Sequence, residues 1–359
     1  MSIRVGLDRN EGLGQMGTSE QRVDLVFEGG GVKGIALAGA FAELDARGFQ
    51  PQCLAGTSAG AITAALVAAG YTGSEIERIV TQDMHFPSFQ DPSPLRKLGR
   101  VGAAIDIAKR RGIHSGAYFL AWMQEKLSAH GLTQFGQLKD AAASDERRRY
   151  KLQVIASDLS DHSMLVLPRD ASRLGIDPDQ LRVADAVRMS MSIPFFFVPV
   201  IHQNPRSGGQ HMIVDGGILS NFPLWLFDST PLKPRFPTFG VELVAPPTQV
   251  EDAQAQGAPP PTLPSFVDYL KSLVNTATQA HDRFYLEDED FARTIAISTL
   301  GVNTTDFQIT PDRVAALIQS GHDATDKFLA TWDFEAWVET HRSGGDQRPA
   351  SSKSQAAPA

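Results

Sequence analysis

Near its beginning, the chain twice passes from a short strand-forming run through a glycine-rich turn into a helix-forming segment. In chain order the two units are Asp24–Glu28, Gly29–Gly34 and Ile35–Arg47, then Gln52–Ala55, Gly56–Gly60 and Ala61–Ala69. Strands that alternate with helices in this way are typical of a parallel sheet covered by helices. The repeated pattern therefore predicts the α/β fold class.

The rest of the chain continues this alternation. Further strands are expected at Lys151–Ala156, Met164–Leu167, Met212–Val214 and Thr238–Leu243, and helices at Val183–Met191, Phe266–Leu286 and Pro311–Leu329. Since α/β enzymes often exceed about 250 residues as one unit, we expect a single domain over residues 21–338. It would contain a mostly helical insertion at about 74–140 and a mobile loop at about 245–264. The polar segments 1–20 and 344–359 are typical of disordered tails.

Charge and residue usage exclude several kinds of partner. The formal charge of −8 argues against nucleic acid, because a phosphate backbone requires a basic face. Cys53 is the single cysteine, so neither an intrachain disulfide nor a Cys-based zinc site can form. The histidines lack metal-binding spacing, and we expect no metal and no cofactor. With no signal peptide and no apolar run long enough to span a bilayer, we expect a cytoplasmic protein whose membrane contact is at most peripheral. Export by a leaderless route stays open.

The second glycine turn, Gly56–Gly60 (GTSAG), is a G-x-S-x-G element with Ser58 at its centre. A serine on a sharp strand-to-helix turn projects its hydroxyl above the sheet, and the amides that begin the helix favour an anion. A simple tight turn is the alternative interpretation. The preceding strand and the following alanine-rich helix favour a nucleophile.

The first glycine turn, GGGVKG, has three interpretations. It fits the spacing of a dinucleotide loop, but the second strand runs into the serine turn and lacks the acidic residue that would bind a ribose. It can be a structural turn. It can also be an oxyanion hole, in which consecutive amides converge on a developing negative oxygen. The last interpretation is favoured by the nucleophile turn one strand later, and its amides are those of Gly29, Gly30, Gly31 and Val32.

An aspartate, Asp215, follows an apolar strand and precedes Gly216 and Gly217. An aspartate before glycine is most often a turn residue. In parallel sheets, however, strand ends are where catalytic groups gather. The two preceding motifs favour a catalytic role.

The ordered trio GGGVKG, GTSAG and DGG resembles the patatin-like phospholipase family, whose pattern is G-G-G-x-R/K-G, then G-x-S-x-G, then D-G-G/A. The residues that support these motifs are Lys33, Gly34, Gly56, Gly60, Gly216 and Gly217. Lys33 stands where the family often has arginine. Ser190–Phe197 (SMSIPFFF) and Asn221–Pro223 (NFP) add to the likeness. It covers roughly residues 22–245 and, more loosely, the helices to about residue 335.

The resemblance implies a patatin-like three-layer α/β/α sandwich with a mainly parallel central sheet. It also implies a catalytic dyad without histidine, in which Ser58 attacks an acyl ester and Asp215 accepts its proton. The amides of the glycine loop would form the oxyanion hole. The substrate would be a phospholipid or another acyl-ester lipid, and the activity that of a phospholipase A or lysophospholipase.

The sequence leaves three alternatives open, two in function and one in catalytic machinery. The same acyl-enzyme could transfer its acyl group to an alcohol or a lysolipid. A regulatory lipid-binding protein could use a hydrolase scaffold. A Ser-Asp-His triad would need a histidine after Asp215, for which the candidates are His281, His322 and His341. Phe195–Phe197 would either line an acyl-chain channel or belong to the ordinary core.

Overall fold

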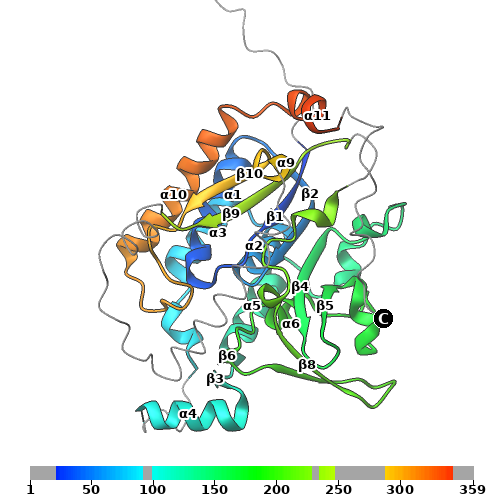
Figure 1. Ribbon diagram of the computed structural model, residues 1–359, viewed down its shortest axis with the longest axis vertical. Helices are drawn as coiled ribbons and strands as arrows, with labels where there is room; N and C mark the ends of the chain where they lie inside the picture. The colour runs from blue at the N-terminus through cyan, green and yellow to red at the C-terminus, as the bar shows by residue number, and fades with distance from the viewer. Residues whose placement is uncertain (1–21, 92–98, 229–233, 247–287, 343–359) are drawn as a thin grey trace, which may run out of the picture.

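The protein is built around one mixed sheet, shown in Figure 1. The computed structural model describes residues 22–91, 99–228, 234–246 and 288–342. Within them the strand order is β10-β9-β1-β2-β4-β8-β7, and β5 also pairs with β4. The strands are β1 (Arg22–Phe27), β2 (Gln50–Thr57), β4 (Leu152–Asp158), β5 (Ser163–Leu167), β7 (Val200–Gln203), β8 (Gln210–Asp215), β9 (Thr238–Val244) and β10 (Thr294–Ser298). The five strands from β10 to β4 are parallel, which confirms the predicted α/β class with a mainly parallel sheet.

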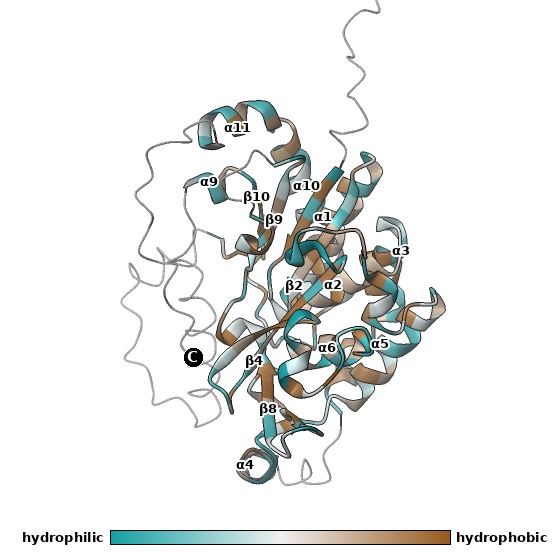
Figure 2. Ribbon diagram, turned by 90° about the vertical axis from the view of Figure 1, so that its right-hand side faces the viewer, coloured by the Kyte–Doolittle hydropathy of each residue, from teal (hydrophilic) through white to brown (hydrophobic). Residues whose placement is uncertain are grey.

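Helices flank this sheet. Their bounds are α1 (Ala36–Ala46), α2 (Ala59–Ala68), α3 (Gly73–Arg78), α4 (Gly99–Arg110), α5 (Ala117–Ala129), α6 (Val183–Ser190), α9 (Asp288–Phe291), α10 (Pro311–Leu329) and α11 (Phe334–Arg342). Figure 2 shows α1, α2, α3, α5 and α6 together on one side of the sheet. Among the described residues, no helix combines the length and the apolar character needed to cross a bilayer.

Alternation along the strands divides the core between the two faces of the sheet. On β1, Leu25 and Phe27 belong to the large cluster that includes residues of α1, α2 and α10. Val26, between them, belongs to a smaller cluster that includes Phe222 and Phe227. Successive side chains of a strand point to opposite faces, so the segment around residues 222–227 covers the face that those helices leave uncovered.

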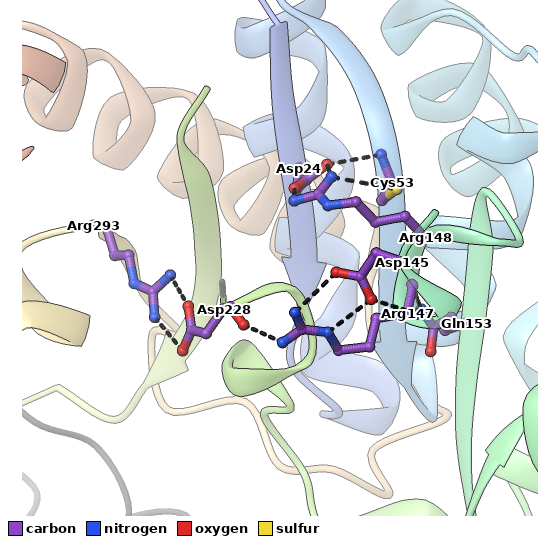
Figure 3. Close-up of polar contacts among 8 residues, drawn as sticks. All are labelled: Asp24, Cys53, Asp145, Arg147, Arg148, Gln153, Asp228 and Arg293. Atoms are coloured by element: carbon purple, nitrogen blue, oxygen red, sulfur yellow. Dashed lines mark hydrogen bonds and ion pairs between the residues drawn. The ribbon is translucent and has the colours of Figure 1, made fainter. Parts of the chain in front are cut away.

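A partly buried polar network holds this segment, and Figure 3 shows its members. Arg148 binds the Asp24 carboxylate through two nitrogens, at 3.1 and 2.5 Å. Arg293 binds Asp228 in the same two-nitrogen manner, at 2.6 and 3.0 Å, and Arg147 donates to the Asp228 carbonyl oxygen. We call this set, Asp24, Cys53, Asp145, Arg147, Arg148, Gln153, Asp228 and Arg293, the arginine cluster.

The insertion expected to be mostly helical contains α3, α4 and α5 but is not helical throughout. Gly112–His114 forms β3, which pairs in parallel with β6 (Phe195–Phe197) as a separate two-stranded sheet. The predicted helix at 266–286, most of the predicted loop at 245–264 and the two predicted tails lie outside the described residues.

The strand that carries Asp215 departs from the sequence interpretation, which placed this residue at the end of a parallel strand. β8 runs antiparallel to β4. Because β5 occupies one edge of β4 along residues 154–158, β2 and β8 must share the other edge. Thr57 of β2 pairs with Ile155, and Asp215 of β8 pairs with Ala156, the next residue of β4. The carboxyl ends of β2 and β8 therefore meet head to head, and this places Asp215 beside the serine turn.

Candidate active site

The serine turn joins β2 to α2 at Ser58, the residue that precedes the helix. Its backbone has φ 52° and ψ −119°, a region that a residue with a side chain rarely adopts and that costs about 1–3 kcal/mol. Neighbouring glycines permit this turn, since a Cβ on Gly56 would lie 2.4 Å from the Gly60 backbone, and one on Gly60 would lie 2.2 Å from the Phe27 carbonyl oxygen. The Ser58 amide donates to the Ser190 hydroxyl at 2.8 Å. Packing thus holds the serine in a strained conformation.

Asp215 is a buried carboxylate with unused acceptor capacity. The Gly217 amide donates to its Oδ1 at 2.8 Å, whereas its Oδ2 has no hydrogen-bond partner in the described part of the chain. Burial raises the pKa of Asp215 from 3.8 to about 7, and it outweighs the Ser58 hydroxyl and the Gly217 amide, which both lower the pKa. The hydroxyl therefore lies near the carboxylate without a hydrogen bond of regular geometry, which is common before a substrate binds.

The glycine loop packs directly against the serine turn. A Cβ on Gly34 would lie 2.4 Å from the Ala59 Cβ, so only glycine allows this approach. Asn221 holds the start of the loop, because its side-chain amide donates to Glu28 and to the Gly29 carbonyl oxygen at 2.9 and 3.0 Å. In the sequence, Asn221 was part of the family resemblance but had no assigned role. Its contact with Gly29 joins residues 192 positions apart, which no local pattern reveals.

The four amides of this loop are not equivalent. The Gly29 amide donates to the Asn221 carbonyl oxygen at 3.0 Å, and the Val32 amide donates to the Thr304 carbonyl oxygen at 2.9 Å. The amides of Gly30 and Gly31 have no acceptor among the residues that the structure describes. Gly31 has φ +54°, and this left-handed conformation redirects the chain at the point where helical structure begins. Two of the four predicted donors are thus committed to the scaffold, and two are available.

Ser58 lies in the wall of a pocket beside the serine turn. Apolar side chains dominate its lining, which comes from α1, α2, the glycine loop, the insertion, the segment after α6 and the segment between β10 and α10. The lining residues are Gly31, Val32, Gly34, Ile35, Ala38, Ser58, Ala59, Ile62, Thr63, Leu66, Ile76, Val80, Met84, Phe86, Phe89, Phe119, Met191, Ile193, Phe197 and Phe307.

The insertion supplies a wall of this pocket that the sequence interpretation did not assign. The pocket is lined here by Ile76, Val80 and Met84, at intervals of four residues. This spacing aligns side chains on one helical face, so it was the feature of the sequence that could have predicted the wall. Of the three phenylalanines in β6, Phe197 lines the pocket. Phe196 instead stacks on Phe307, with ring centroids 4.9 Å apart.

Histidines do not contribute to the pocket lining among the described residues. His322 contacts Glu43 and Glu77, at 3.1 and 2.6 Å, and the His341 ring lies 5.8 Å from the Trp337 ring. His281, the other histidine considered for a triad, lies outside the described residues.

One group in the described part of the chain has ligand atoms close enough to hold a metal ion. It consists of Asp158, Asp161 and His211, with one such atom of each within 4.8 Å of the others. His211 Nδ1 lies 2.6 Å from Asp158 Oδ2, so a hydrogen bond between them already accounts for the pair. None of the three lines the pocket that contains Ser58.

A strained serine after a parallel strand, a carboxylate of raised pKa beside it and an apolar pocket place the chain in the class of α/β proteins with a hydrolase-type site. The chain belongs to the patatin-like phospholipase family, which matches residues 25–228. Members of this family act on lipid substrates, and the chain is a lipid hydrolase by this relationship.

Two relatives extend the match in sequence. The chain is 37% identical over 316 residues to the uncharacterized protein YqhO of Bacillus subtilis (strain 168), and the alignment covers 87% of this chain and 99% of that protein. It is 24% identical over 223 residues to the uncharacterized protein R571 of Acanthamoeba polyphaga mimivirus, with 58% of this chain and 63% of that protein covered.

Two solved structures align with most of the chain. VipD from Legionella pneumophila matches with a TM-score of 0.47 and 20% identity, over 87% of this chain and 67% of VipD. The type III effector protein ExoU matches with a TM-score of 0.43 and 15% identity, over 87% of this chain and 53% of ExoU. The aligned region thus spans about half of ExoU.

Proposed function

We propose that this protein is a serine lipid acyl hydrolase of the phospholipase A or lysophospholipase type, with Ser58 as nucleophile and Asp215 as general base. One observation carries the proposal: a hydroxyl in a strained turn lies in the wall of a mainly apolar pocket, beside a carboxylate whose pKa is about 7. A pocket of this composition accommodates a fatty acyl chain, and the family acts on lipids. The hydrophilic part of the substrate would stay outside.

In the acylation step, the Ser58 hydroxyl attacks the ester carbonyl carbon and transfers its proton to Asp215. We assign this proton to Oδ2, because that atom has no other partner among the described residues. The tetrahedral oxyanion would accept hydrogen bonds from the amides of Gly30 and Gly31, which are available. When the carbon–oxygen bond to the alcohol breaks, Asp215 returns the proton to the leaving oxygen.

Water then resolves the acyl-enzyme by the same steps in reverse. Asp215 removes a proton from the attacking water, the second tetrahedral intermediate collapses, and the proton returns to Ser58 as the fatty acid leaves. A free aspartate is a poor base near neutral pH, because its ordinary pKa is about 4. A pKa of about 7 matches the proton affinity to the working pH, which is the favourable condition for general base catalysis.

The proposal is tested by labelling and by product analysis. A fluorophosphonate probe should label the wild-type protein and not Ser58→Ala, whereas Ser207→Ala in an exposed turn serves as the matched control. Purified protein with defined phospholipids should release free fatty acid. With an added alcohol or lysolipid, an acyl-ester product would identify acyl transfer. Absence of both labelling and product, in a folded protein, would favour a lipid-binding role and contradict the proposal.

The assignment of the pocket to the acyl chain has its own test. Met84 is only partly buried where it lines the pocket, so Met84→Trp should narrow the space without removing a core side chain. Hydrolysis of long-chain esters should fall, while hydrolysis of an acetyl ester should be retained. Equal losses for both esters would contradict this assignment.

A further inference from the structure

A buried cation, Arg188 on α6, takes no part in the chemistry described so far. Arg188 is only 6% exposed, although arginine is seldom buried without a charged partner. None of the ion pairs among the described residues includes it, and only Asp91 acts on it at longer range. Burial lowers its pKa to about 10, so it stays protonated at neutral pH. Such a charge is costly, and its retention requires a reason.

The contacts of Arg188 join three separate parts of the chain. Its Nη2 donates to the carbonyl oxygens of Ser115 and Val198, at 2.7 and 2.9 Å. These residues directly follow β3 and β6, so the guanidinium spans the end of the small sheet. Its Nη1 donates to the Ser192 hydroxyl, and its Cζ lies 5.6 Å from the centroid of the Phe197 ring.

The backbone is shaped around this guanidinium. Gly116 has φ +70°, and a Cβ at that position would lie 2.4 Å from Arg188 Nε. A glycine is therefore required on two counts, the left-handed backbone and the space that the side chain occupies. The arrangement brings the insertion, through residues 115 and 116, into direct contact with α6.

The segment that Arg188 anchors contacts both residues of the proposed dyad. The Ser190 hydroxyl accepts the Ser58 amide at 2.8 Å. The Ser192 carbonyl oxygen accepts the Asp215 amide at 3.0 Å. Between and after these serines, Met191 and Ile193 line the pocket. A displacement of this short segment would therefore move the nucleophile, the base and the pocket wall together.

We propose that Arg188 is a positioning residue that holds the segment from Ser190 to Ser192, and through it the dyad, in register with the pocket wall formed by the insertion. The inference rests on the proposed function of Ser58 and Asp215. Arg188 is not among the groups that shift the pKa of Asp215, so its role is geometric rather than a direct electrostatic one. A small misplacement of reacting groups can reduce turnover by about 10²-fold.

The test compares Arg188→Met, which keeps the length and removes every donor, with Arg188→Lys, which keeps the charge but has no planar fork. On a soluble acetyl ester, Arg188→Met should lower kcat by about 10²-fold with little change in KM. The pH at which kcat/KM is half-maximal should also shift, because Asp215 moves relative to its surroundings. Arg188→Lys should recover part of the kcat loss, since an ammonium reaches some of the three acceptors.

Arg293 supplies the matched control, because it is equally buried, at 2% exposure, but binds Asp228 and Asp290 in the arginine cluster and its surroundings. Arg293→Met should lower the melting temperature while the folded enzyme keeps its kcat and pH profile. Wild-type kcat in both Arg188 variants would overturn the inference. So would an Arg188→Met enzyme that, like Arg293→Met, loses only melting temperature and keeps its kcat while folded. If Arg188→Met does not fold, wild-type kcat in Arg188→Lys overturns it. Failure of the dyad itself would instead appear as activity in Ser58→Ala.

Discussion

Two buried aspartates on the same sheet have opposite surroundings. Asp24 of β1 accepts from two nitrogens of Arg148 and from the Cys53 amide at 3.0 Å. Asp215 of β8 accepts from the Gly217 amide, and its second oxygen has no partner among the described residues. Burial raises the pKa of both carboxyl groups. For Asp24, however, Arg148 and Cys53 oppose burial, and no cation opposes it at Asp215.

The comparison separates stability from reactivity. A buried charge with all its hydrogen bonds made is fixed in one state, and removing its partner leaves an uncompensated charge. A buried carboxyl group with an unused oxygen can accept a proton during a reaction, because no bond must break first. The backbone strain at Ser58 lies beside the second aspartate, as is common at functional sites. The arginine cluster and the proposed dyad are therefore expected to respond to substitution in opposite ways.

The largest effect is expected at the dyad. Ser58→Ala and Asp215→Asn should each lower kcat by at least about 10⁴-fold, and the double variant should be scarcely worse than either single one, because the two residues act as a unit. Ester hydrolysis by the purified variants measures this, with circular dichroism as the control for folding. Multiplicative losses in the double variant would contradict a shared role.

Second in size is the effect at the glycine loop. A Cβ on Gly30 would lie 2.4 Å from the end of the Leu243 side chain and 3.0 Å from Lys33 Cγ, so Gly30→Val must either displace these side chains or shift the loop. Losing one oxyanion donor costs about 10²–10³-fold in turnover. Turnover near the wild-type value in a folded Gly30→Val enzyme would refute this donor.

The raised pKa of Asp215 should also make the stability of the protein depend on pH. Because the pKa of Asp215 is 3.8 when unfolded and about 7 when folded, its contribution is most favourable below pH 4 and is lost as pH rises to about 7. Asp215→Asn has no such titration. As pH rises over that range, the unfolding free energy of the variant should therefore increase relative to that of the wild type by up to about 4 kcal/mol. Urea unfolding at several pH values measures the difference, while kcat/KM of the wild type should rise through pH 7. A constant difference would mean that the folded pKa is not raised.

A smaller effect is expected at the arginine cluster. Arg148→Met leaves the Asp24 charge without its partner, which should lower the unfolding free energy by about 3 kcal/mol, the low end for a buried pair, because the Arg148 side chain is 26% exposed. The exposed pair of Arg182 and Asp185 gives the control, since Arg182→Met should cost less than about 1 kcal/mol. Folded Arg148→Met should keep its kcat. A fall in kcat without loss of stability would break the comparison.

Removal of metal ions is expected to have no effect on activity. A dyad that uses no metal-bound water predicts that excess EDTA leaves hydrolysis of a soluble short-chain ester unchanged. Asp158, Asp161 and His211 are the described group whose ligand atoms are close enough to bind an ion, and they lie outside the pocket lining. Loss of activity on chelation, with recovery on adding calcium, would contradict the metal-independent mechanism.

The sequence by itself determined the local conformations on which the site depends. Glycines around Ser58 and in GGGVKG predicted two tight turns, and short apolar runs predicted β1, β2, β4 and β9, because turn sterics and alternation act over a few residues. The three motifs were also sufficient to indicate the family. Each of these signals is contained in a short stretch of chain.

Only the tertiary structure decided how distant segments meet. Three features of the site join residues that are far apart in the chain. They are the head-to-head approach of β2 and β8, the hydrogen bonds of the Gly29 and Val32 amides to Asn221 and Thr304, and the pocket wall formed by the insertion. No local propensity encodes such contacts. They follow from which edge of β4 each strand occupies and from which side chains fill the space above it. The pKa of Asp215 belongs with them, since burial by the whole fold, rather than any neighbour in sequence, raises it.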